Sequence, residues 1–227
     1  MGVSELSSSA QNYLKTIWNL QEWSDSPVTA SVIADRMGLR LSTVSDGVRK
    51  LTSQGLVAHA PYGTIDLTDA GRSHAMAMVR RHRLIETFLV QVLEYRWDEV
   101  HDEAETLEHA VSDLMIDRID RLLQYPPRDP HGDPIPSAEG AVTAPRAAPL
   151  SSGMAGSRVV VQRISDADPA MLQYFATQGI VLDAQLDVME SEPYSGTVVV
   201  RVAGKDTSTS LGGAAASAIW VSPPATS

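Results

Sequence analysis

The 227-residue chain contains no cysteine. This absence excludes disulfides, thiolate nucleophiles, iron–sulfur clusters and every zinc site built on cysteine. A metal ligand in this chain must be a nitrogen, an oxygen or the sulfur of a methionine. Basic residues are also scarce, since 18 Lys and Arg oppose 28 Asp and Glu and give a formal net charge of -10. Because this charge repels phosphate at long range, any contact with nucleic acid must be local or assisted by bound cations.

Long apolar runs are missing as well. None reaches the roughly 18 residues that a membrane-spanning helix needs, and no basic region followed by an apolar one opens the chain. We therefore expect a soluble, cytoplasmic protein with no membrane partner. The length allows one large domain or two ordinary ones, each able to bury a core, and the composition favours a division.

Three helices are expected near the N-terminus. Apolar residues recur at helical spacing over 8–23, and Thr29 is placed to cap a short helix that ends at Gly38. A further helix from Ser42 to about residue 54 has an apolar inner face and a small, polar and basic outer face. A short helix, a turn and a second helix of this kind are typical of a helix-turn-helix, although an ordinary helical subdomain gives the same pattern.

A hairpin follows these helices. Residues 56–58 begin a strand, Pro61, Tyr62 and Gly63 form a turn, and 64–67 form the returning strand. A helix-turn-helix followed by a hairpin is the order found in winged DNA-binding domains, so this stretch predicts one.

The stretch HDEAETLEH, from His101 to His109, concentrates metal-binding side chains. In a helix, His101, Glu105, Glu108 and His109 project into one sector about 100° wide. A solvated acidic face is the plainer reading of such a stripe, but stacked carboxylates cost free energy unless a cation offsets them.

A second His/Glu pair strengthens the metal interpretation. His82 and Glu86 lie four residues apart in another segment with helical spacing, predicted from Thr68 to about Leu93. Two pairs at ligand spacing favour a divalent metal.

The composition and the periodicity of the chain change after about residue 125. Apolar spacing over 111–123 predicts a helix that serves a dimer interface or the core, and the Pro, Ala, Gly and Ser content from 125 to 156 is typical of a linker. Strands are expected at 158–164, 184–190, 197–202, 207–211 and 219–221, with a helix at 169–178. The expected fold is mainly α with a small C-terminal β-barrel, in four segments: a winged helix-turn-helix domain (1–72), a helical metal-binding and dimerisation domain (73–140), a linker (141–156) and a barrel domain (157–227).

Three motifs carry a resemblance to a known family. They are RRHRLIETFL from Arg80, HDEAETLEH with the following Ala110 to Asp113, and DPHGDPIP from Asp129. With them the chain resembles the diphtheria-toxin-repressor family of metal-activated transcription regulators, most closely manganese-type members with an SH3-like (FeoA-like) C-terminal domain.

The resemblance implies two metal sites. A primary site would comprise Asn12, Glu105, Glu108 and His109, and an ancillary site would comprise His82, Glu86, His101 and Asp168. Iron-type members have Cys at the position of Glu105, and a hard carboxylate there favours Mn²⁺ over Fe²⁺ or Zn²⁺. Asn12 departs from the manganese-type pattern, which has Asp at this position.

The expected function is that of a homodimeric, manganese-activated repressor of metal homeostasis that binds a double-stranded DNA operator. An iron- or zinc-responsive regulator is an alternative within the family, and a two-metal hydrolase or a metal carrier would leave the winged module unused. Base and phosphate contacts are expected from the second helix and the wing, at Arg40, Ser42, Thr43, Ser45, Asp46, Arg49, Lys50 and Tyr62.

Overall fold

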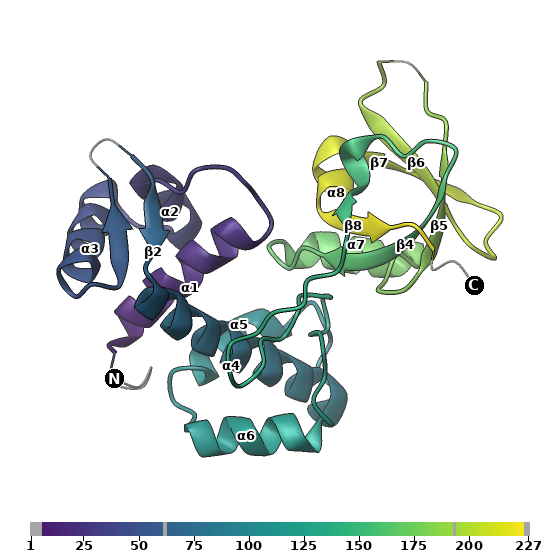
Figure 1. The fold of residues 1–227 in the computed structure, drawn as a ribbon. Helices are drawn as coiled ribbons and strands as arrows, with labels where there is room; N and C mark the ends of the chain where they lie inside the picture. Colours follow the sequence, from purple (N-terminus) through teal and green to yellow (C-terminus); the bar gives the residue numbers. More distant parts are fainter. Residues whose placement is uncertain (1–5, 61–62, 193, 225–227) are drawn as a thin grey trace. The chain divides into compact units, whose positions relative to one another are not determined.

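The computed structural model describes residues 6–60, 63–192 and 194–224 and divides into two compact units (Figure 1). The first unit holds the chain up to Ile85, together with Glu105–Asp120 and Ile135–Val142. The second unit holds Glu86–Ala104, Arg121–Pro134 and the remainder from Thr143. None of the described helices is long and apolar enough to cross a membrane.

The first unit begins with three helices and a hairpin. Helix α1 spans Ser8–Glu22, α2 spans Ala30–Met37 and α3 spans Leu41–Ser53, followed by the antiparallel strands β1 (Val57–His59) and β2 (Ile65–Leu67). Thr29 caps α2 through its side chain, and Gly38 ends it with a left-handed φ of 63°, which glycine adopts without strain. The predicted helix-turn-helix and the two strands of the predicted hairpin are therefore confirmed, whereas the predicted turn residues Pro61 and Tyr62 lie outside the described residues.

The core of this module joins α1 to α2, α3 and the hairpin. Leu14 and Ile17 of α1 are fully buried with Ile33, Val44 and Ile65. Tyr13 packs in the same cluster, and its hydroxyl donates to the carbonyl of Thr43 in the first turn of α3 (3.3 Å). The position of α1 is thus tied directly to that of α3.

Three helices form the middle of the chain: α4 (Asp69–Leu93), α5 (Val100–Leu107) and α6 (Asp113–Leu122). Thr68 Oγ1 accepts from the backbone N–H of Gly71, which caps α4 as the sequence predicted. Helix α5 ends at Leu107, so Glu108 and His109 lie in the turn that follows it. Part of the predicted metal-binding stripe is therefore not helical.

The second unit contains a six-stranded antiparallel sheet in the order β3-β8-β4-β5-β6-β7. Its strands are β3 (Ala148–Pro149), β4 (Arg158–Ile164), β5 (Gln185–Met189), β6 (Thr197–Val202), β7 (Ser208–Gly212) and β8 (Ile219–Ser222). Helix α7 (Pro169–Gln178) packs on the sheet through Leu172 and Phe175, and a short α8 (Gly213–Ser217) precedes β8 (Figure 1). The 3-10 helix η2 (Leu150–Ser152) follows β3.

The sheet is open, so the predicted closed barrel is not confirmed. Among the described residues, β3 pairs only with β8 and β7 only with β6, and these two strands remain the edges. The strand β3 and helix η2 also lie within the range expected to be an unstructured linker. Both are too short for a periodic signal, which explains why the sequence pattern did not reveal them.

Candidate metal centres

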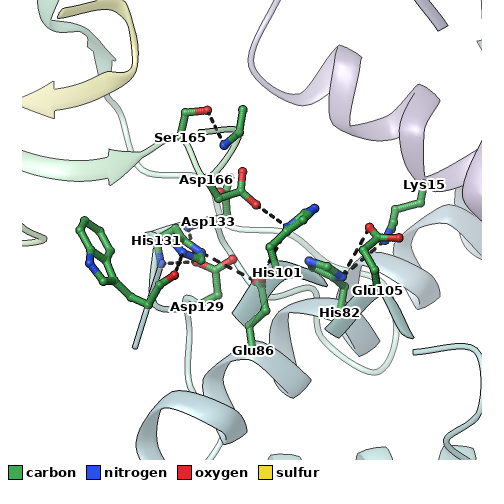
Figure 2. Close-up of polar contacts among 12 residues, drawn as sticks. Lys15, His82, Glu86, His101, Glu105, Asp129, His131, Asp133, Ser165 and Asp166 are labelled. Atoms are coloured by element: carbon green, nitrogen blue, oxygen red, sulfur yellow. Dashed lines mark hydrogen bonds and ion pairs between the residues drawn. The ribbon is translucent and has the colours of Figure 1, made fainter. Parts of the chain in front are cut away.

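The first cluster lies in the first unit, where α1 meets the end of α5. Lys15 Nζ donates to Glu105 Oε1 and to both carboxylate oxygens of Glu108, at 2.7 and 2.8 Å. His82 Nδ1 lies 2.6 Å from Glu108 Oε2 and 3.4 Å from Lys15 Nζ. The two carboxylates therefore converge on a buried ammonium. Figure 2 shows Lys15 beside Glu105 and His82.

The charges of this cluster are coupled. Glu108 is completely buried, which by itself raises the pKa of its carboxyl. Its hydrogen bond to His82 and the positive charge of Lys15 outweigh burial and hold that pKa below its ordinary value. Glu108 is thus an anion inside the protein, and Lys15 supplies the compensating cation.

His109 lies beside Glu108, and Asn12 lies on α1 between Gln11 and Lys15. His109 Nδ1 donates to Gln11 Oε1 (2.6 Å), which leaves Nε2 as the ring nitrogen with the lone pair in the neutral form, 3.6 Å from Glu108 Oε1. Asn12 Oδ1 is buried and has no hydrogen-bond partner. A metal-ligating histidine ordinarily donates its second N–H to a fixed acceptor, and an unpaired buried oxygen is costly unless something binds it.

Lys15 and Gln11 are not among the site residues predicted from the sequence. Both lie on α1 with Asn12, and at 100° per residue the three fall within one sector of about 100°. The same count places the apolar residues Tyr13 and Leu14 on another side of α1, so the periodicity alone did not indicate a buried polar sector. The contact of Lys15 with Glu105 and that of Gln11 with His109 join residues 90 and 98 positions apart, which no local pattern reveals.

The second cluster lies in the second unit. His101 Nδ1 lies 2.9 Å from Asp166 Oδ2 and 3.5 Å from Glu86 Oε1. Burial lowers the pKa of His101, but the hydrogen bonds to Asp166 and Glu86 outweigh it and raise that pKa to about 10. Glu86 and His101 of the predicted ancillary site are therefore neighbours.

Asp168 and His82, which were also assigned to that site, have hydrogen-bond partners of their own. Asp168 is the N-cap of α7, where its side chain accepts from the backbone N–H groups of Ala170 and Met171. The carboxylate that lies beside His101 is that of Asp166, two residues earlier in the chain. His82, assigned to the same site, has Glu108 as its hydrogen-bonded partner in the first unit.

The predicted DNA-binding residues lie on the exposed side of α3. Arg40 precedes the helix as its N-cap residue, and Ser42, Thr43 and Lys50 are exposed. Ser45 Oγ donates to the Leu41 carbonyl (2.9 Å), while Arg49 Nη1 donates to Asp46 Oδ1 (2.7 Å) within the helix. Tyr62 lies outside the described residues.

Comparison with known proteins decides the family. The chain matches the model of the iron dependent repressor N-terminal DNA binding domain over residues 5–65, that of the metal binding and dimerisation domain over 68–137, and that of the FeoA domain over 148–223. It is 32% identical over 210 residues to the iron-dependent repressor IdeR of Mycobacterium tuberculosis, covering 87% of this chain and 90% of that protein. The chain belongs to the diphtheria-toxin-repressor family.

Two further relatives of the diphtheria-toxin-repressor family extend the comparison. The diphtheria toxin repressor of Corynebacterium glutamicum is 30% identical over 208 residues, covering 87% of this chain and 90% of that protein. A solved manganese-dependent transcriptional repressor in complex with manganese is 54% identical, with a TM-score of 0.90, and covers 94% of this chain and 99% of that one. This member of the diphtheria-toxin-repressor family is a metal-responsive, DNA-binding repressor and not an enzyme, which removes the hydrolase alternative.

Proposed function

We propose that the chain is a homodimeric, manganese-activated repressor and that Asn12, Glu105, Glu108 and His109 hold the activating ion. The observation that carries this proposal is the donor set of the first cluster. Two carboxylates converge there, a histidine is oriented by Gln11, and the buried oxygen of Asn12 has no partner. The residues present therefore fit a divalent cation.

The choice of manganese rests on the chemistry of these donors. Carboxylate and amide oxygens suit a hard divalent ion, and the chain has no thiolate to favour a softer one. The relatives are named for different metals, since IdeR is called iron-dependent and the solved repressor is called manganese-dependent. An iron- or zinc-responsive repressor is the alternative, and DNA binding measured with each metal in turn separates the three.

The coupling to DNA runs through α1. Gln11 and Lys15 contact the first cluster, and Tyr13 on the same helix donates to Thr43 at the start of α3. When bound, the cation would supply two positive charges and a link between α1 and the end of α5. Displacing Lys15 from Glu105 and Glu108 would reset the position of α1, and with it the exposed first turn of α3.

The DNA and dimer surfaces complete the proposal. Arg40, Ser42 and Thr43 would face base edges, and Lys50 would approach phosphate. Leu114 and Met115 of α6 are 65% and 47% exposed, which suits a helix that packs against a second copy. We also propose the division into a winged domain (1–72), a helical domain (73–140), a linker (141–156) and a C-terminal domain (157–227).

The test compares two variants of the first cluster with a matched control. Glu108→Gln and His109→Ala should abolish manganese-dependent binding to promoter DNA in mobility-shift assays while the metal-free circular dichroism remains that of a folded protein. Glu103→Gln removes an exposed carboxylate from the preceding helix α5 and should bind DNA as the unsubstituted protein does. A cluster variant that retains the original manganese midpoint would disprove the assignment.

A further inference from the structure

The loop from Arg128 to Pro134 has no role in the site described so far, yet it is held firmly. Asp129 Oδ1 accepts from the backbone N–H groups of His131 (2.8 Å) and Asp133 (2.9 Å), and Arg128 and Pro134 form a β-bridge at its ends. A Cβ on Gly132 would lie 2.1 Å from the carbonyl oxygen of Gln162, so only glycine fits against β4. The loop therefore has one conformation.

His131 in this loop is buried, and its hydrogen bonding fixes its proton. Its Nε2 lies 2.7 Å from the carbonyl oxygen of Trp97, and because a carbonyl only accepts, Nε2 carries the hydrogen. The Trp97 ring stacks on the imidazole with a centroid separation of 5.9 Å and fixes its plane. In the neutral ring Nδ1 then bears the lone pair, and this buried atom has no hydrogen-bond partner.

The side chain that faces this lone pair is Glu86. Nδ1 of His131 lies 3.8 Å from Glu86 Oε2, while Glu86 Oε1 lies 3.5 Å from Nδ1 of His101 (Figure 2). The two oxygens of one buried carboxylate thus face two different histidines. Each histidine has its own second carboxylate, Asp166 for His101 and Asp129 for His131.

The spacing suits a cation better than a direct ion pair. A distance of 3.8 Å is too long for a hydrogen bond between Nδ1 and Oε2. One ligand atom from each of Glu86, Asp129 and His131 lies within 4.8 Å of the others. Around an ion with bonds of about 2.1 Å, ligand atoms are about 3.0 to 4.2 Å apart, so a contraction of under about 2 Å would close the set.

We infer that Glu86, Asp129 and His131 form a divalent-metal site that shares the Glu86 carboxylate with a neighbouring site at His101 and Asp166. Glu86 is then a bridging ligand, with Oε2 serving one ion and Oε1 the other. The carbonyl of Trp97 has the role of the acceptor that orients a metal-binding histidine. Oxygen donors with one imidazole suit Mn²⁺, and water molecules would complete the coordination. The inference stands independently of the proposed DNA-binding switch.

The test counts manganese on the full-length protein and asks whether two ions are coupled. Asp129→Asn preserves the oxygen that accepts from His131 and Asp133 but removes the charge, and His131→Gln removes the imidazole. Each variant should bind one fewer Mn²⁺ per chain in equilibrium dialysis, with affinity at this site weakened by more than about tenfold. Electron paramagnetic resonance should show spin-coupled manganese in the unsubstituted protein and only isolated ions in both variants.

The matched control is Glu190→Gln, which removes an exposed carboxylate of the same unit. It should retain the full number of ions and the coupled signal. Thermal melts of the metal-free proteins establish that each variant is folded. An unchanged manganese count in Asp129→Asn or His131→Gln, or a coupled signal that persists in both, would overturn the inference. These readouts involve no DNA, so they are separate from the outcome of the repressor test.

Discussion

Replacing Lys15 with glutamine should raise manganese affinity while destabilising the metal-free protein. Lys15 Nζ contacts Glu105 and both carboxylate oxygens of Glu108, and its side chain is only 6% exposed. A divalent ion held by the same carboxylates must displace this ammonium. We therefore expect the native lysine to compete with the metal for these carboxylates.

The magnitude follows from the geometry. Opposite charges about 4 Å apart attract by about 4 kcal/mol at an effective dielectric constant of 20. Part of this attraction is recovered when the displaced ammonium is hydrated again. We therefore expect the ammonium to weaken the free energy of Mn²⁺ binding by about 1.4 to 2.8 kcal/mol, which is a ten- to hundredfold effect on affinity. In the metal-free state, removing one partner of a buried ion pair lowers the free energy of unfolding by about 3 kcal/mol. The loss should be smaller here because His82 still contacts Glu108.

Calorimetric Mn²⁺ titration and urea unfolding of Lys15→Gln measure the two effects. Lys205→Gln is the matched control, since it removes the same charge from an exposed lysine whose Nζ donates to the Gln178 carbonyl. The control should match the unsubstituted protein in both assays. A folded Lys15→Gln protein whose manganese affinity is unchanged or weaker would refute the competition between ammonium and metal.

Three further predictions concern the ligands and the DNA surface. Asn12→Asp should lower the Mn²⁺ concentration needed for DNA binding by about tenfold or more, on the order of 1.4 kcal/mol, because it adds an anionic oxygen to the first cluster; an unchanged calorimetric midpoint would show that residue 12 does not reach the metal. Substitutions at Arg40 and Ser42 should change the preference among operator variants. Lys50→Ala should weaken binding to every DNA sequence and reduce the slope of log affinity against log salt concentration by about one. Equal losses of affinity on every sequence for Arg40 and Ser42 would mean that α3 does not read base edges. Despite its burial, the pKa of His101 is raised from 6.5 to about 10. The stabilisation of the metal-free fold by protonated His101 is therefore fully present below about pH 6.5 and is lost as the pH rises through about 10. Urea unfolding from pH 7 to 10 should show this loss, and His101→Gln should flatten the dependence of the unfolding free energy on pH.

Local signals predicted most of the elements. Thr29 and Gly38 bound α2 because capping depends on a few adjacent residues, and the alternation at 158–164 and the proline at 169 located β4 and α7. The closed barrel was not predictable in the same way. Whether two edge strands pair depends on contacts across the whole sheet rather than on the pattern within any strand.

The sequence indicated candidate ligands by residue type but not how their side chains group in space. Helical periodicity placed His101 and Glu105 on one stripe, but His101 faces Glu86 and Asp166 while Glu105 contacts Lys15. The helix ends at Leu107, after which an angle of 100° per residue no longer applies. The role of Asp168 had a local signal, because an aspartate directly before a proline at the start of a helix is an N-cap.

The contacts of the first cluster join parts of the chain that are remote in sequence. Lys15 and Glu108 are 93 residues apart, and Gln11 and His109 are 98 apart. Contacts that close such long loops form late in folding, and interactions absent from the transition state act mainly on the rate of unfolding. A cation held by the first cluster should therefore prolong the lifetime of the folded protein with little effect on how fast it folds. Resistance to proteolysis in the cell would then rise with the supply of metal. The metal would in this way affect the amount of the protein as well as its binding to DNA.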